Sequence, residues 1–214
     1  MSEVFDRQGP EIDLSANVTA FFRDMVDVAR RKSGIEATEA AQTYVVALLA
    51  DYAKPDHRTG ETLCRPLTLL LSEALQQAGH ERFERLRILG DGVLYVSGFF
   101  GDHLQNRGVE LDYVSSVGAR AYGGAASMLR KSGTFSGSSE AAAPDVFSEL
   151  SERFQAFVEL LSYIADTVLA SSAHGSNRAV LKAYERWLRT GSASLAEALA
   201  SRGLVPLRGD GTLH

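Results

Sequence analysis

Asp91 is the carboxylate with the strongest potential for chemistry, because it adjoins a strongly apolar stretch of a predicted helix. A carboxylate that leaves water needs a partner to offset the cost of desolvation. Arg87 precedes it by one helical turn, and this spacing predicts a structural ion pair, the interpretation that we favour. The alternative is a ligand pocket in which Asp91 is an acid of raised pKa, lined also by Tyr95 and Tyr122.

The five residues from Arg87 to Asp91, Arg-Ile-Leu-Gly-Asp, resemble the R-x-L-G-D segment of the distal helix of heme oxygenases. In that family, glycines let the helix lie against the porphyrin, and the aspartate organises water near the iron. The resemblance implies a small-ligand or cofactor-binding helical protein in which Gly90 approaches the ligand. The first predicted helix contains no histidine to act as the proximal iron ligand. We therefore expect Gly90 to be a packing gap and expect no cofactor.

Metal and nucleophile motifs are missing from the sequence. A carboxylate-bridged metal pair in a helical bundle needs Glu-x-x-His motifs, and the sequence has none. The histidines are scattered over predicted helix ends, loops and the terminus: His57, His80, His103, His174 and His214. Cys64 has no visible base at a recognisable spacing, and there is no Gly-x-Ser-x-Gly, P-loop or dinucleotide fingerprint. We expect no metal site and no catalytic residue, and we lean away from an enzyme.

A basic stripe follows one predicted helix near the C-terminus. Its members recur at spacings of three and four residues: Arg178, Lys182, Arg186 and Arg189. A solvated helix face is the ordinary explanation of such a pattern. The sharper hypothesis is a surface that binds an acidic partner protein.

The bulk composition narrows the class of protein. The 214 residues, 45% of them hydrophobic and 23% charged, are enough for one large globular domain. The net charge of −5 argues against nucleic acid as the main partner. Apolar runs are too short and too polar to span a bilayer, so we expect no membrane contact. The single cysteine and the polar, acidic N-terminus indicate a cytoplasmic protein without a signal peptide.

Residues 83–104 predict the central helix of the fold. Apolar side chains recur there at spacings of three and four: Phe83, Leu86, Leu89, Val93, Val96, Phe100 and Leu104. Between Val93 and Phe100 the helix is apolar on almost every side, which is typical of a helix enclosed by neighbours in a bundle. Each glycine inside this helix costs about 1 kcal/mol relative to alanine. Close approach of another backbone is the explanation that we favour for these glycines.

The rest of the chain predicts the surrounding helices. No stretch shows sustained two-residue alternation, so the fold class is all-α, a single-domain bundle of seven or eight helices. We expect helices over residues 15–32, 36–53, 66–78, 83–104, 110–131, 145–171 and 176–190, and a short last helix with Ser194 and Glu197 as a capping box. The helical domain covers residues 15–203, with a mobile loop at 132–144. Residues 1–14 are expected to be a flexible arm, and 204–214 an irregular tail.

Large helical faces without catalytic motifs indicate a non-enzymatic interaction or regulatory protein that binds a partner protein or itself, and a homodimer is one form of this. The alternative hypothesis is the small-ligand protein of heme-oxygenase-like type, with Arg87, Gly90, Asp91, Tyr95 and Tyr122 as ligand contacts. A deep pocket lined by the tyrosines and Asp91 would favour the second hypothesis over the first.

Overall fold

The computed structural model describes residues 14–54, 65–131, 145–172 and 176–204. The described residues contain nine α-helices and no strand, which confirms the all-α prediction. The helices are α1 (Leu14–Ser33), α2 (Glu39–Tyr52), α3 (Leu67–Gln76), α4 (Gly79–Asn106), α5 (Leu111–Lys131), α6 (Val146–Glu152), α7 (Phe154–Ser172), α8 (Asn177–Thr190) and α9 (Ala193–Ala200). Among these residues, no helix combines the length and the apolar character that crossing a membrane would need.

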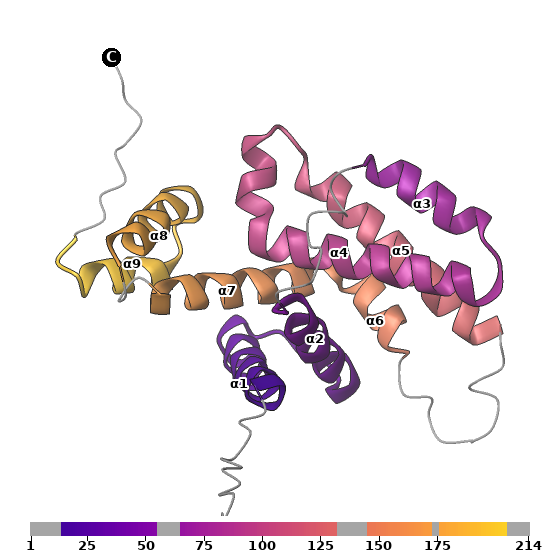
Figure 1. Ribbon diagram of the computed structural model, residues 1–214, viewed down its shortest axis with the longest axis horizontal. Coiled ribbons are helices and arrows are strands. Elements are labelled where there is room, and N and C mark those ends of the chain that lie inside the picture. Colours follow the sequence, from indigo (N-terminus) through magenta and orange to yellow (C-terminus); the bar gives the residue numbers. More distant parts are fainter. Residues whose placement is uncertain (1–13, 55–64, 132–144, 173–175, 205–214) are drawn as a thin grey trace, which may run out of the picture.

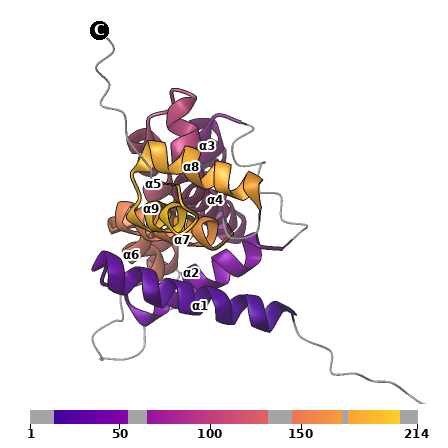
Figure 2. The ribbon, with the colours of Figure 1, turned by 90° about the vertical axis from the view of Figure 1, so that its left-hand side faces the viewer.

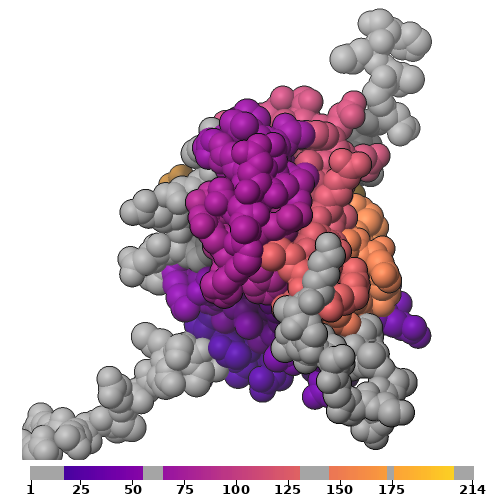
Figure 3. All heavy atoms as spheres, turned by 90° about the vertical axis from the view of Figure 1, so that its right-hand side faces the viewer, coloured from indigo at the N-terminus to yellow at the C-terminus, as the bar shows by residue number. Residues whose placement is uncertain are grey.

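Helix α7 runs through the middle of the molecule and divides it into two sides (Figure 1). The α1–α2 pair lies on one side of α7, and α3, α4 and α5 lie on the other. Helices α8 and α9 pack at the C-terminal end of α7, where Figure 2 shows them in front. At the opposite end, the space-filling view shows α3 and the start of α4 in magenta beside α5 in salmon (Figure 3). The bundle therefore has a main body and a smaller α8–α9 cap.

Helix α4 is the central helix, as predicted. Leu86, Val93 and Leu94 are fully buried, and the buried residues extend over most of its length. Its glycines allow close contacts with neighbouring helices. A Cβ added at Gly98 would overlap the Leu161 Cβ on α7, so the two helices could not approach as closely with any other residue there. The predicted close approach is thus present at this position.

A kink in α4 corrects one assignment to the buried face. Phe100 has non-helical backbone angles (φ −128°, ψ 16°), and its side chain is 45% exposed. Glycine and serine pairs are common sites of kinks, and Ser97 and Gly98 precede this one. Figure 1 shows the last turns of α4 standing at an angle to the rest of the helix. The prediction that Phe100 belongs to the core is therefore wrong, because the apolar periodicity assumed a straight helix.

The glycines of α4 allow a paired test of this packing. We expect Gly98→Ala to lower the free energy of unfolding by about 1–3 kcal/mol, because overpacking outweighs the gain in helix propensity. Gly101→Ala is the matched control, since its Cβ would meet only the Leu111 methyl groups at 3.5 and 3.7 Å, which is ordinary contact. The control should gain about 0.5–1 kcal/mol from the lower entropy of the unfolded chain. Urea denaturation of the two variants measures both changes, and equal effects would contradict the close approach.

Several predicted helix ends are wrong. The helix predicted over 145–171 is broken at Arg153, which leaves the helical region (φ −115°, ψ 27°) and separates α6 from α7. The predicted capping box at Ser194 is also absent, because Ser192 is the N-cap of α9 and Ser194 lies within the helix. The helix predicted over residues 15–32 begins at Leu14 and ends at Ser33. Local sequence signals located these helices but shifted their ends by one to a few residues.

A buried carboxylate from α6 fixes the start of α2. Glu149 accepts hydrogen bonds from the backbone nitrogen of Thr38, at 3.0 Å, and from the Thr38 hydroxyl. Thr38 is the N-cap of α2, and its hydroxyl accepts from the nitrogen of Ala41 at 3.2 Å. Arg153 pairs with Glu149 at 3.7 Å and also donates to the Glu36 carbonyl. This network sets the position of α2. It therefore also sets the position of the α2 tyrosine that contacts α4.

Several predictions lie outside the described residues. They are the flexible arm over residues 1–13, the loop at 132–144 and the tail from 205, together with Cys64, His57, His174 and His214. The described part of the domain begins at Leu14 and ends at Leu204. Within it, the two core clusters correspond to the main body and to the α8–α9 cap.

Candidate functional site

Asp91 lies in a buried polar cluster where α2, α4 and α5 meet. Tyr44 of α2 donates its hydroxyl to Asp91 Oδ1 at 2.6 Å, and Tyr122 of α5 donates to the same oxygen at 2.8 Å. Arg87 Nη1 donates to Oδ2 at 2.9 Å, so the predicted ion pair is present. The other amino group of Arg87 donates to Glu84 at 2.7 Å. The guanidinium group thus bridges two carboxylates on one face of α4.

The electrostatics of this cluster follow from burial. Burial raises the pKa of Asp91 above its ordinary value, while hydrogen bonds from Tyr44 and Tyr122 and the charge of Arg87 oppose that rise. Burial and the neighbouring carboxyl group also raise the pKa of both tyrosines. The hydrogen bond to Glu84 is the largest contribution to the raised pKa of Arg87. The tyrosines therefore act as protonated donors, and the cluster is suited to holding three helices together.

The raised pKa of Asp91 has a measurable consequence. The folded protein binds the Asp91 proton more tightly than the unfolded chain, whose carboxyl titrates near 3.8. The stabilisation that the folded protein gains from this tighter proton binding is therefore complete below about pH 3.8. It is lost as the pH rises through the pKa of Asp91 in the folded protein. We expect wild type to lose stability relative to Asp91→Asn, which cannot titrate, as the pH rises from about 4 toward neutrality. Urea denaturation of both proteins across this range measures the difference, and a constant difference would contradict it.

The other two predicted ligand residues, Tyr95 and Gly90, face protein side chains. Tyr95 stays outside the cluster and stacks between Tyr52 and Phe99, with ring centroids 4.3 and 4.7 Å apart. The gap at Gly90 is filled by Tyr122, whose Cδ1 would lie 2.7 Å from an added Cβ. Gly90 therefore faces a protein side chain, in contrast to the role that the heme oxygenase resemblance implies.

Tyr44 is the member of the cluster that the sequence argument missed. It lies on α2 and packs against the hydrophobic core. A buried tyrosine hydroxyl usually needs a hydrogen-bond partner, so a tyrosine in this helix was itself a signal. The sequence could not indicate which carboxylate it would meet.

A second buried network joins α8 to α4 and α7. Arg186 forms an ion pair with Asp166 of α7, and its Nη1 donates to the Phe99 carbonyl at 2.8 Å, next to the α4 kink. Both charged side chains are buried. Asp102 of α4 lies 3.6 Å from Arg186 and accepts from Arg189 at 2.9 Å. This network attaches the α8–α9 cap to the main body.

The predicted basic stripe is therefore only partly available to a partner. Arg178 and Lys182 are exposed. Arg186 is buried because it shares the inward face of α8 with Ala183 and Trp187, and Arg189 is paired with Asp102 on α4. The prediction that all four side chains form one solvent-facing surface is wrong at Arg186.

An open groove lies between α8 and the end of α4, above α7. Its volume is about 650 Å³. Side chains from α4 and α7 form an apolar floor, and polar and charged side chains from α4, α7 and α8 form the walls and rim: Phe99, Phe100, Ala165, Val168 and Leu169, with Asp102, His103, Ser172, Lys182, Glu185, Arg186 and Arg189. Figure 1 shows the last turns of α4 and α8 on the same side of α7. We call this cavity the α4–α7–α8 groove.

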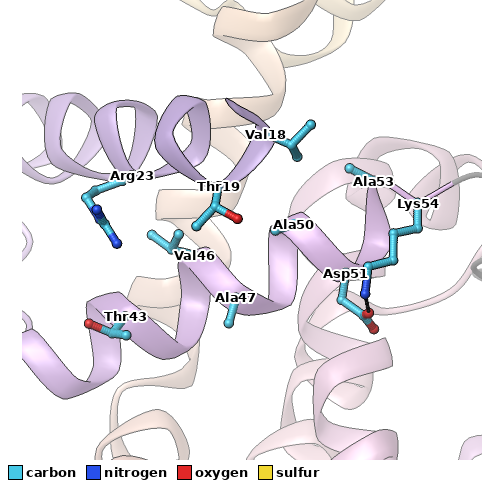
Figure 4. A pocket seen from close by; sticks show the side chains of 10 residues that line it. All are labelled: Val18, Thr19, Arg23, Thr43, Val46, Ala47, Ala50, Asp51, Ala53 and Lys54. Atoms are coloured by element: carbon cyan, nitrogen blue, oxygen red, sulfur yellow. Dashed lines mark hydrogen bonds and ion pairs between the residues drawn. The ribbon is translucent and has the colours of Figure 1, made fainter. Parts of the chain in front are cut away.

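A second groove separates α1 from α2 and has a volume of about 550 Å³. Figure 4 shows that the two helices diverge and that short side chains such as Ala47 and Ala50 leave space between them. Lys54 pairs with Asp51 at 2.7 Å at one end. This lining contains no aromatic side chain, whereas the α4–α7–α8 groove contains two phenylalanines.

The described residues contain no group of three or more histidine, cysteine, aspartate or glutamate side chains that could hold a metal ion. Asp91 is in the lining of neither groove. Comparison of the chain with protein-family models, with curated proteins and with solved structures finds no significant match.

Proposed function

We propose that this chain is a non-enzymatic interaction protein that binds an amphipathic helical segment of a partner protein in the α4–α7–α8 groove. The observation that carries the proposal is an apolar floor that includes an exposed aromatic ring, Phe100, which the kink in α4 turns away from the core. Aromatic and arginine side chains around a concave apolar patch are the usual composition of binding hot spots.

The dimensions of the groove suit a helix. The α8 residues that line the groove run from Lys182 to Arg189, which corresponds to about two helical turns. A helix that lies in an apolar groove contributes anchors at spacings of three, four and seven residues over that length. The groove is open to solvent along its rim, where exposed charged residues lie on α8 and His103 is exposed on α4.

The charges around the groove favour an acidic partner. Arg178 and Lys182 are exposed on α8, and Glu185 is the exposed carboxylate beside them. Asp102 is already paired with Arg189. Arg178 lies one helical turn beyond the groove lining, so the rim together with this adjoining turn of α8 carries more exposed positive than negative charge, although the whole chain has a net charge of −5. Complementary charges of this kind increase the association rate and the specificity of a complex.

The buried carboxylates support a binding role over catalysis. Asp91, Glu149 and Asp166 are each hydrogen-bonded to a side chain from another helix. A catalytic acid or base needs access to a substrate within hydrogen-bond distance. These three carboxylates instead join helices, which leaves the groove surfaces as the better candidates for function.

Site-specific photo-crosslinking in cells tests the proposal. A benzoylphenylalanine at position 100 or 182 should give one discrete adduct, and the same probe at Ile88 should give none. Ile88 is a matched control because it lies on the same helix and is 54% exposed, against 45% for Phe100. A synthetic peptide of the cross-linked segment should be an acidic helix, and Phe100→Ala should weaken its binding about tenfold or more.

Two results would contradict this function. Adducts that form equally at Ile88 would mean that the groove has no special affinity. An adduct with twice the mass of the chain would show that the groove binds a second copy of the protein and not a different partner protein. Isothermal titration of the peptide against wild type and Phe100→Ala then separates specific binding from incidental cross-linking.

A further inference from the structure

A separate polar cavity lies behind the α4–α7–α8 groove. Its volume is about 230 Å³, and it lies between α4, α5, α7 and α8. Its lining is made of small and polar side chains with a few apolar ones: Ser97, Gly98, Gly101, Asp102, Gln105, Leu111, Gln155, Val158, Glu159, Ser162, Arg186, Arg189 and Thr190. Asp102, Arg186 and Arg189 also line the groove, so they form a wall between the two cavities.

Ser97 supplies the observation that points to a ligand. The residue is only 3% exposed, and its Oγ is buried without a hydrogen-bond partner among the described residues. Most buried side-chain polar atoms are hydrogen-bonded, and each exception needs an explanation. A nearby buried serine, Ser115, donates its hydroxyl to Gln155 at 3.4 Å. Ser97 lines a cavity instead, so a molecule in the cavity can supply its missing partner.

The charges in the wall favour an uncharged ligand. Arg186 is paired with Asp166, and Arg189 is paired with Asp102. A ligand with a net charge would therefore lie near both positive and negative side chains, so their effects on it would largely cancel. It would lose its hydration shell without gaining an unpaired charge of opposite sign. Glu159 is exposed, so it lies at the mouth of the cavity rather than in its depth.

The polar groups of the lining match a molecule with several hydroxyl groups. The Ser97 hydroxyl can both donate and accept, the Ser162 hydroxyl can donate while it accepts from Arg186, and the Thr190 hydroxyl, which donates to the Arg186 carbonyl, can accept. The amide of Gln155 offers its two N–H donors because its oxygen already accepts from Ser115. Val158 and Leu111 offer apolar surface for carbon–hydrogen faces. The volume corresponds to the share of roughly eight water molecules in the liquid. We propose that this cavity binds a small uncharged polyol, independently of any partner in the groove.

Ligand-observed NMR of the full chain tests this proposal. Glycerol, erythritol and myo-inositol at millimolar concentration are the probes, and acetate and methylammonium are the charged comparisons. We expect at least one polyol to show saturation transfer, and Ser97→Ala to weaken its binding at least fivefold. Ser116→Ala is the matched control, since this serine is exposed on α5 and donates to the Tyr113 carbonyl at 2.7 Å. The control should bind the polyol like wild type.

The melting temperature shows whether Ser97→Ala still folds. Removing a hydroxyl that has no partner breaks no hydrogen bond, so the variant should melt at or above the wild-type temperature. A clear drop would show that Ser97 has a partner within the protein, which overturns the proposal. Equal polyol binding by wild type and Ser97→Ala, no binding of any polyol, or tighter binding of either ion would also overturn it. Phe100→Ala should leave polyol binding unchanged, so this proposal and the groove can fail separately.

Discussion

Arg186→Ala is expected to lower the free energy of unfolding by about 3–5 kcal/mol, because it leaves Asp166 as an uncompensated buried charge. Arg186 and Asp166 are 8% and 6% exposed, so water cannot replace the lost guanidinium group easily. The Phe99 carbonyl at the kink also loses its donor. Urea denaturation followed by circular dichroism measures the change. Lys182→Ala on the exposed face of the same helix is the control and should change stability by less than about 0.5 kcal/mol.

A double variant separates the charge effect from simple loss of packing. Arg186→Met combined with Asp166→Leu removes both charges and keeps similar volume, and such replacements are often neutral or stabilising. We therefore expect the double variant to recover most of the stability lost in Arg186→Ala. If the double variant is as unstable as the single one, the contribution of Arg186 comes from its contact with α4 rather than from the ion pair.

The sequence was sufficient to identify the central helix but insufficient to identify its kink. The spacing of Leu86, Leu89 and Val93 depends only on the local helical period, and all three are buried as expected. The kink at Phe100 involves a hydrogen bond from Arg186, which is 87 positions away from Phe99. A pattern of local apolar residues contains no information about such a distant donor. The exposed phenylalanine, which carries the proposed function, therefore emerged only from the tertiary structure.

The same limit applies to the polar side chains. Arg87 and Asp91 are one turn apart, and the ion pair between them followed from the sequence. The partners from α2 and α5 depend on how three helices meet, and Tyr122 was predicted near Asp91 only as part of a pocket. Arg186 was assigned to a solvated stripe because cations are seldom buried. Asp166, its partner, interrupts an apolar stretch of α7, and this interruption was the available signal.

The two buried networks explain how a helical chain with several interior charges can have one defined arrangement. Each network joins helices that approach from different directions: α2, α4 and α5 meet at Asp91, and α4, α7 and α8 meet at Arg186. Apolar contacts tolerate sliding, whereas hydrogen bonds to a buried carboxylate fix both distance and direction. We therefore expect the two networks to determine which helix faces stay available for binding. We also expect the network at Arg186 to hold in place the wall between the groove and the polar cavity.

Asp91→Ala is expected to destabilise the fold by about 3–5 kcal/mol, because three donors lose their acceptor at once. Tyr122 is fully buried, so its hydroxyl has no access to water, and Tyr44 would lose the bond that joins α2 to α4. Glu84→Ala is the control: it removes the other partner of Arg87, but at a site that is 33% exposed, so we expect a loss of only about 0–1 kcal/mol. Thermal and urea denaturation of both variants measure these effects.

A double-mutant cycle then tests whether the effect comes from the cluster. Tyr122→Phe alone should cost about 1.5–3 kcal/mol, since its hydroxyl donates to a carboxylate. Once Asp91 is alanine, removing the Tyr122 hydroxyl should cost little or even relieve the unsatisfied donor, which gives a coupling energy of about 0.5–3 kcal/mol. Strictly additive losses would mean that the two residues act separately.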